Sequence, residues 1–218
     1  MIIDDETYQN RYEYCKEFID KLCIWRSKNG EKLPGKMVGH EYVWMFYLRR
    51  GLFYKDFLEC IAEMFIYKVE REIGHFNFQL AGMETASTPM LTAIPLICRA
   101  HGIEIEAFSI RKERKEYGLR NWIEGVPNKH LPVMLVDDLC NSQNSLLKAY
   151  EIVEQNKLEL LGSSFTIVNK ANKEDEYKMD GDKYFKNADI PMNFISLYTL
   201  DDFNLYIAPG DDLDMFNN

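Results

Sequence analysis

The chain has 218 residues, of which 46% are hydrophobic and 28% are charged, and its formal net charge at pH 7 is −9. A chain of this length and composition can bury one good core and carry a small appendage. The acidic balance argues against a general nucleic-acid binder, since such a protein would carry a basic surface. No apolar run approaches the roughly 20 residues that cross a bilayer, so no membrane association is expected.

The N-terminus and the cysteines indicate a cytoplasmic protein. The sequence begins M-I-I-D-D-E, which is acidic where a secretory signal would be basic and then apolar. The cysteines form no C-x-x-C or Cys/His group, which is typical of reduced thiols and not of disulfides or a zinc site. The five are Cys15, Cys23, Cys60, Cys98 and Cys140.

The N-terminal third, residues 1–73, is predicted to form a helical cap and an aromatic hood. Apolar residues at helical spacing predict an amphipathic helix over residues 6–27. The aromatic stretch 41–52 is expected to be extended, and a second helix is expected over residues 58–71.

From residue 74 to residue 200, strand and helix patterns alternate. Strands are predicted at 78–82, 105–110, 132–137, 160–168 and 190–197, and helices at 88–100 and 143–156. Such alternation is typical of an α/β fold, with a parallel sheet flanked by helices. Residues 201–218 form an acidic tail that is expected to fray at its end.

The stretch 133–146 reads V-M-L-V-D-D-L-C-N-S-Q-N-S-L and carries the clearest chemical signal. Its apolar run suits a strand buried on both faces, which would place Asp137 and Asp138 where parallel sheets bind ligands. The following helix offers backbone N–H groups to an anion. This arrangement suits a sugar phosphate, but a solvated turn with Asn141 or Ser142 as the helix N-cap would fit the same segment.

Two further loops also follow predicted strands. The segment 82–89, G-M-E-T-A-S-T-P, has small residues whose N–H groups and hydroxyls suit a diphosphate, although a capped helix start would also explain it. The segment 111–118, R-K-E-R-K-E-Y-G, has four basic residues within five positions of an acidic chain. Charge runs are usually solvated surfaces, but the position of this one between two candidate anion loops favours anion binding.

Three such loops in this order closely resemble the type I phosphoribosyltransferase family, and most of all its orotate branch. The resemblance covers roughly residues 41–155. It rests on Y-V-W-M-F-Y-L-R-R-G-L, the 82–89 loop, I-R-K-E-R-K-E-Y-G-L-R-N-W-I-E-G and V-M-L-V-D-D-L. The basic loop is the most specific piece, because it separates the orotate branch from the others.

The resemblance implies an enzyme that transfers phosphoribosyl from 5-phosphoribosyl 1-pyrophosphate to a nitrogenous base or related acceptor. It implies Mg²⁺ bound through this donor, with no direct protein ligand, and a homodimer in which Lys115 reaches the neighbouring subunit's site. Catalytic roles fall to Lys115, Asp137 and Asp138, and pyrophosphate binding to Glu84, Thr85, Ala86, Ser87, Arg111 and Lys112. The 5′-phosphate loop would be Asn141, Ser142, Gln143, Asn144 and Ser145, and Lys170 would bind the acceptor.

Several positions depart from the family pattern. Gln143 stands where the family has a glycine, Asn144 where it has a threonine and Tyr117 where it has a histidine. Lys170 stands where orotate enzymes tend to have arginine, whose planar fork suits a carboxylate better. We therefore expect orotate to be a weak or absent acceptor. Two alternatives stay open: a non-catalytic regulator that binds the donor or a nucleotide, and a defence- or toxin-type effector that acts on another base or nucleotide.

Overall fold

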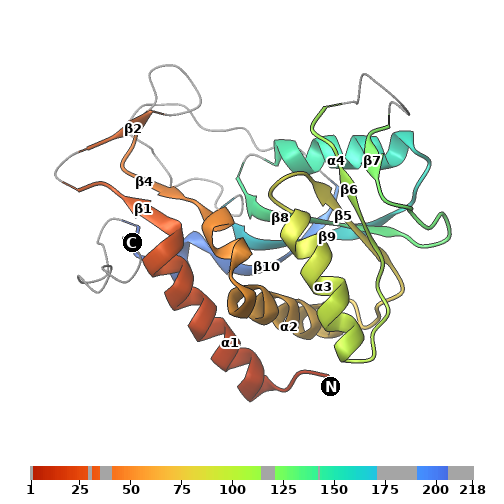
Figure 1. Cartoon of the computed structure of the whole chain (residues 1–218), viewed down its shortest axis with the longest axis horizontal. Coiled ribbons are helices and arrows are strands. Elements are labelled where there is room, and N and C mark those ends of the chain that lie inside the picture. Colours follow the sequence, from red (N-terminus) through yellow and green to blue (C-terminus); the bar gives the residue numbers. More distant parts are fainter. Residues whose placement is uncertain are drawn as a thin grey trace.

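The computed structural model describes most of the chain and places a mixed sheet between helices (Figure 1). The described residues are 2–28, 31–34, 41–113, 121–141, 143–170 and 191–205. The predicted α/β class, with a parallel sheet flanked by helices and an N-terminal helical and aromatic hood, is confirmed. Within the described part of the chain, no helix has the length and apolar character needed to cross a membrane.

The main sheet has six strands in the order β10-β9-β8-β5-β6-β7. All neighbouring pairs are parallel except β6 and β7, which are antiparallel. The strands are β5 (Gln79–Met83), β6 (Ala107–Ile110), β7 (Ile123–Glu124), β8 (Val133–Cys140), β9 (Leu160–Asn169) and β10 (Asn193–Thr199). Because β5, β6, β8 and β9 are parallel, the loops that follow them leave the same edge of the sheet.

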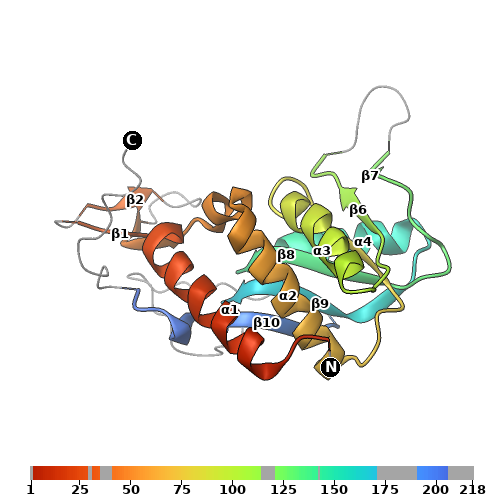
Figure 2. The same ribbon diagram turned by 60° about the horizontal axis from the view of Figure 1, so that its bottom comes forward.

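Apolar side chains cover both faces of the sheet, which explains the uninterrupted apolar run before the acid pair. Met134 and Val136 of β8 belong to the core shared with α2 (Lys55–Glu72) and α3 (Thr88–Ala100). Val133 and Leu135 belong to the core on the other face, under α4 (Asn144–Gln155). The arrangement of helices on the two faces can be followed in Figure 2. Neighbouring strand residues point to opposite faces, so a run of four apolar residues fits a strand covered twice.

The hood differs from its prediction at the end of the first helix. Helix α1 spans Asp5–Phe18, a π-helical turn follows at Ile19–Cys23, and the chain then forms strand β1 (Ile24–Arg26). β1 pairs antiparallel with β4 (Trp44–Phe46), so the single helix predicted over residues 6–27 is too long. Tertiary strand pairing overrides the helical periodicity here.

The aromatic segment of the hood is only partly extended. Strands β3 (Glu41–Tyr42) and β4 agree with the prediction, and β3 pairs with β2 (Leu33–Pro34). Beyond them, Leu48–Phe53 forms a 3₁₀ helix, η2, where extended chain was predicted.

The hood shares one hydrophobic core with the sheet. Residues from α1, α2, β4 and β10 belong to the same buried cluster. Hydrogen bonds reinforce it: Tyr12 Oη donates to Asp202 at 2.6 Å, and Tyr198 Oη donates to the carbonyl of Tyr12 at 2.7 Å. The five cysteines are buried and free.

Candidate functional site

Asp137 and Asp138 lie near the carboxyl end of β8. This strand continues to Cys140 and is therefore longer than predicted. Asp137 is only 8% exposed. Its Oδ1 accepts a hydrogen bond from the backbone N–H of Asp138 at 3.0 Å, and Asp138 Oδ1 accepts one from Leu139 N–H at 2.9 Å. These bonds hold both carboxylates at the carboxyl edge of the sheet, where open α/β sheets bind ligands.

Burial raises the pKa of both carboxyl groups above their ordinary value. The charge of Asp138 raises the pKa of Asp137 further, and the positive charge of Lys112 opposes this. Arg49, from η2 of the hood, likewise opposes the rise at Asp138. Two carboxylates held in a poorly hydrated place favour a ligand that brings hydroxyl donors or a cation.

The small-residue loop leads from β5 into α3 and is packed tightly against β8. A Cβ atom at Gly82 would lie 2.5 Å from both Ser87 Oγ and the carbonyl oxygen of Val136, so only glycine fits there. Ser87 is fully buried, and its Oγ donates to the carbonyl of Met83 at 2.5 Å. The Ser87 hydroxyl thus stabilises the loop, and the pyrophosphate role of Glu84, Thr85, Ala86 and Ser87 stays a prediction. The Glu84–Thr85 peptide bond is cis.

The basic loop meets the small-residue loop at Lys112. The backbone N–H of Lys112 donates to Glu84 Oε1 at 3.2 Å. Arg111 donates through its backbone N–H to the carbonyl of Trp122 at 2.8 Å, and its guanidinium pairs with Glu124 at 2.8 Å. The structure thereby places Lys112 beside Glu84, and the role of Arg111 and Lys112 in pyrophosphate binding stays a prediction. The predicted Lys115 and Tyr117 lie outside the described residues.

Gln143, in the loop proposed to bind the 5′-phosphate, has a backbone conformation that its residue type does not favour. Gln143 is the N-cap residue of α4 and has φ 59°, in the left-handed region that favours glycine. A non-glycine residue in this region costs about 1 kcal/mol or more. Gln143 therefore adopts a conformation that glycine would adopt without this cost.

Among the described residues, none caps the N-terminus of α4 with its side chain. Gln143 makes no side-chain cap hydrogen bond, and the first turn, with Asn144 and Ser145, contains no acidic residue. The capping interpretation does not hold for Asn141, because Gln143 occupies the cap, while Ser142 lies outside the described residues. Uncapped N–H groups and the positive end of the helix dipole favour a phosphate here.

Lys170 follows the end of β9, next to the end of β8, and meets the hood. Its backbone N–H donates to the carbonyl of Cys140 at 2.8 Å. Its Nζ lies 4.9 Å from the centroid of the buried Trp44 ring, within cation–π range. Burial lowers the pKa of Lys170 to about 8.

Sequence reasoning missed Trp44 and Arg49 as neighbours of the site. Both belong to the aromatic segment that carries the resemblance, but the sequence did not show which of its side chains face the sheet. The signal was present in Leu48-Arg49-Arg50, a basic pair that follows an aromatic strand in an acidic chain.

No family model matches the chain. Among curated proteins, it is 28% identical over 170 residues to the orotate phosphoribosyltransferase of Methanosphaera stadtmanae, which covers 78% of this chain and 85% of that protein. It is 31% identical over 127 residues to the orotate phosphoribosyltransferase of Methanothermobacter thermautotrophicus, covering 58% of this chain and 62% of that protein.

Solved structures with a similar fold also include orotate phosphoribosyltransferases. The Mycobacterium tuberculosis orotate phosphoribosyltransferase in complex with Fe(III) dicitrate has a TM-score of 0.68 at 22% identity, covering 88% of this chain and 98% of that chain. The fold is that of a type I phosphoribosyltransferase. The same enzyme in complex with 5-phospho-alpha-D-ribosyl 1-diphosphate has a TM-score of 0.60 at 17% identity, covering 93% of this chain and 94% of that chain. The resemblance to type I phosphoribosyltransferases, including orotate phosphoribosyltransferases, is confirmed.

Proposed function

We propose that this chain is a phosphoribosyltransferase that transfers phosphoribosyl from 5-phosphoribosyl 1-pyrophosphate to a nitrogen of a base or related acceptor. The observation that carries the proposal is the meeting of a basic loop, a small-residue loop and an acid pair at one edge of the sheet. Lys112 contacts Glu84 and acts electrostatically on Asp137. The names of the sequence relatives and structural neighbours support the same class.

In this proposal, Asp137 and Asp138 orient the ribose hydroxyls. The amides of residues 84–87, together with Arg111 and Lys112, bind the pyrophosphate. The 5′-phosphate lies at the N-terminus of α4, against residues 141–145. Lys115 approaches the pyrophosphate of the neighbouring subunit, as the resemblance implies.

The residues of the site fit Mg²⁺ that arrives with the donor. Mg²⁺ prefers oxygen ligands and is usually held by one or two carboxylates together with substrate phosphates. The carboxylates of Asp137 and Asp138, whose pKa values burial raises, provide negative charge near a cation that the donor carries, without binding it directly. No group of three metal-ligating side chains occurs among the described residues, and a metal held through the donor does not need one. Bound there, Mg²⁺ would neutralise charge on the departing pyrophosphate.

The reaction displaces pyrophosphate by an acceptor nitrogen. The bond from the anomeric carbon to the pyrophosphate oxygen breaks, and a bond from the same carbon to nitrogen forms. Positive charge develops on the ribose ring and negative charge on the leaving group. Fixed charges at Arg111 and Lys112 stabilise the second of these, and a single preorganised contact of this kind is typically worth about 10²–10³ in rate.

At the acceptor end, we propose a base other than orotate. Lys170 offers a single point charge, where the planar fork of an arginine would bind a carboxylate through two hydrogen bonds. The ammonium group of Lys170 already lies within cation–π range of the Trp44 ring. A site of this kind discriminates poorly in favour of a carboxylated pyrimidine.

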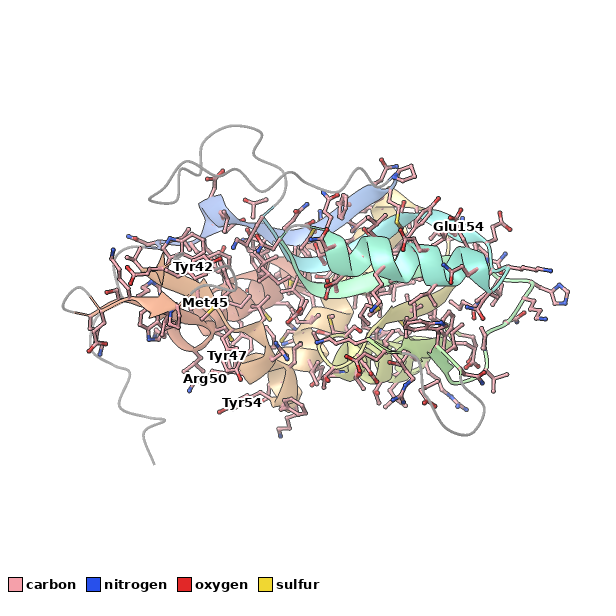
Figure 3. The ribbon with its side chains drawn as sticks, turned by 90° about the horizontal axis from the view of Figure 1, so that it is seen from above. Tyr42, Met45, Tyr47, Arg50, Tyr54 and Glu154 are labelled. Carbon is pink, nitrogen blue, oxygen red and sulfur yellow. The ribbon has the colours of Figure 1, made fainter. Side chains whose placement is uncertain are left out.

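We also propose that the chain forms a homodimer. The hood exposes a group of large apolar side chains, here called the hood face: Met45 at 40%, Tyr47 at 53%, Phe53 at 78% and Tyr54 at 43%. Tyr47, Arg50 and Tyr54 lie along one edge of the hood, and Met45 lies next to them (Figure 3). A second copy of the chain would cover this surface.

The test is to incubate the purified protein with Mg²⁺, the donor and a panel of bases and nucleotides, and to measure pyrophosphate release. The proposal expects release that depends on one acceptor and is lost in a double variant with Asp137→Asn and Asp138→Asn. Donor binding without release would instead indicate a regulator. Absence of donor binding in calorimetry would refute both.

A further inference from the structure

Lys148 of α4, which has no role in the proposed reaction, contacts the basic loop. It lies one helical turn after Asn144, the first residue of the helix that begins at the phosphate loop. Its Nζ donates a hydrogen bond to the backbone carbonyl of Lys112. The same Nζ lies 5.5 Å from the centroid of the Trp122 ring, within cation–π range.

These two partners lie on the described segments at the two ends of the basic loop, residues 111–113 and 121–124, which we call its arms. The arms are joined to each other, because Arg111 N–H donates to Trp122 and the Arg111 guanidinium pairs with Glu124, each at 2.8 Å. Lys148 therefore holds the outgoing arm through Lys112 and the returning arm through Trp122.

Lys112 is the point at which the loops of the site are connected. Its backbone N–H donates to Glu84 of the small-residue loop at 3.2 Å, and its carbonyl accepts from Lys148. Lys148 thus brings a positive charge to the backbone of Lys112, while the Arg111 guanidinium is paired with Glu124.

We propose that Lys148 is a positioning residue: it fixes the arms of the basic loop relative to the helix that starts at the 5′-phosphate loop. The inference rests on the proposed function for its catalytic consequence, but the contact itself does not. Through Lys148, a phosphate bound at the start of α4 and the pyrophosphate bound by Arg111 and Lys112 are kept at a fixed separation. The donor carries both groups on one ribose, so this separation matters for reaction but adds no new contact to the substrate.

The test compares the full-length wild type with Lys148→Met, which keeps an apolar stem over Trp122 but loses the donor and the charge. Lys148→Arg is the conservative variant. Lys129→Met, at an exposed position, is the matched control for the loss of one positive charge. Backbone hydrogen exchange is measured over residues 111–113 and 121–124, with α3 as the internal reference for global stability.

We expect Lys148→Met to speed exchange in both arms about tenfold, the size of losing one hydrogen bond from a charged donor. Exchange in α3 should not change, and Lys148→Arg should restore most of the protection. In the pyrophosphate-release assay, Lys148→Met should lower kcat about tenfold with a much smaller change in KM for the donor.

Unchanged exchange in the arms of Lys148→Met, or an equal rise in α3, would overturn the inference. The inference would also be overturned if Lys129→Met sped exchange in the arms as much as Lys148→Met. A tenfold loss of kcat/KM in Lys148→Met that came from a higher KM alone, with kcat unchanged, would overturn it as well. If the wild type releases no pyrophosphate with any acceptor, the proposed function is what fails, and the exchange data still decide whether Lys148 holds the arms. If Lys148→Met does not fold, Trp122→Leu removes the other half of the contact and must loosen the same arms.

Discussion

Replacing Lys170 with methionine tests whether burial lowers the pKa of the residue proposed to bind the acceptor. Lys170 keeps its ammonium over Trp44, and burial lowers its pKa from the ordinary 10.5 to about 8. The folded protein thus releases this proton near pH 8, whereas the unfolded chain keeps it until about pH 10.5. Between these values the unfolded chain binds more protons, so raising the pH stabilises the wild type.

The size of this effect follows from the shift. One pKa unit corresponds to about 1.4 kcal/mol, so Lys170 should add about 2–3 kcal/mol to the free energy of unfolding between pH 7 and pH 10. Lys170→Met cannot gain this increment, because methionine does not titrate. The difference in unfolding free energy between variant and wild type should therefore move by about 2–3 kcal/mol in favour of the wild type over that range.

The assay is urea unfolding of both proteins at several pH values between 7 and 10, compared at each pH. Buried cysteines such as Cys23 and Cys98, whose pKa values are raised to about 12, also make stability depend on pH. They affect both proteins equally and cancel in the difference. Lys129→Met is the exposed control and should show no such trend. A difference between Lys170→Met and wild type that does not change with pH would refute the reasoning.

Four further outcomes are expected. Asp138→Asn should weaken donor binding in calorimetry about tenfold or more, because it removes a charged acceptor of ribose hydroxyls, and unchanged affinity would contradict its role. Lys115→Ala should lower turnover far more than donor affinity. Mixing this variant with the Asp137→Asn and Asp138→Asn double variant should restore partial activity through hybrid dimers, and a monomer in sedimentation would rule out such complementation. Gly82→Ala should lower the free energy of unfolding by about 1–3 kcal/mol in urea, because its Cβ would lie 2.5 Å from the carbonyl oxygen of Val136. Orotate should be converted to orotidine 5′-phosphate slowly or not at all, and turnover within the usual 1–10³ s⁻¹, roughly, would show that Lys170 serves as well as arginine.

The sheet and its loops could be predicted from sequence because each is a local unit. The helix predicted over residues 88–100 has the bounds that the structure gives α3, and Pro89 lies in its first turn. The apolar run before Asp137 identified a strand buried on both faces, because one-sided burial would have required alternation. The order of strand, loop and helix then placed the acid pair and the two anion loops at the same edge.

The hood could not be predicted in the same way, because its conformation depends on partners distant in sequence. Residues 24–26 continue the helical pattern of α1, but they form a strand since β4 supplies backbone partners and Arg26 donates to the carbonyl of Asn204 at 2.8 Å. Gln143 is a second example. Its φ is positive although its residue type does not favour this conformation, so residue type alone could not have predicted it.

The proposed acceptor end of the site combines residues that follow the sheet with residues of the hood. Lys170 comes from the sheet, whereas Trp44 and Arg49, whose charge acts on Asp138, come from the hood. The residues proposed to bind the donor lie on strand, loop and helix units of the sheet, although the charge of Arg49 in the hood reaches one of them, Asp138. We therefore expect substitutions in the hood other than at Arg49 to alter which acceptor fits without moving the residues proposed to bind phosphate, pyrophosphate and ribose. On this basis, the departure at Lys170 bears on the acceptor, while the proposed donor chemistry depends on Asp137, Asp138 and the basic loop.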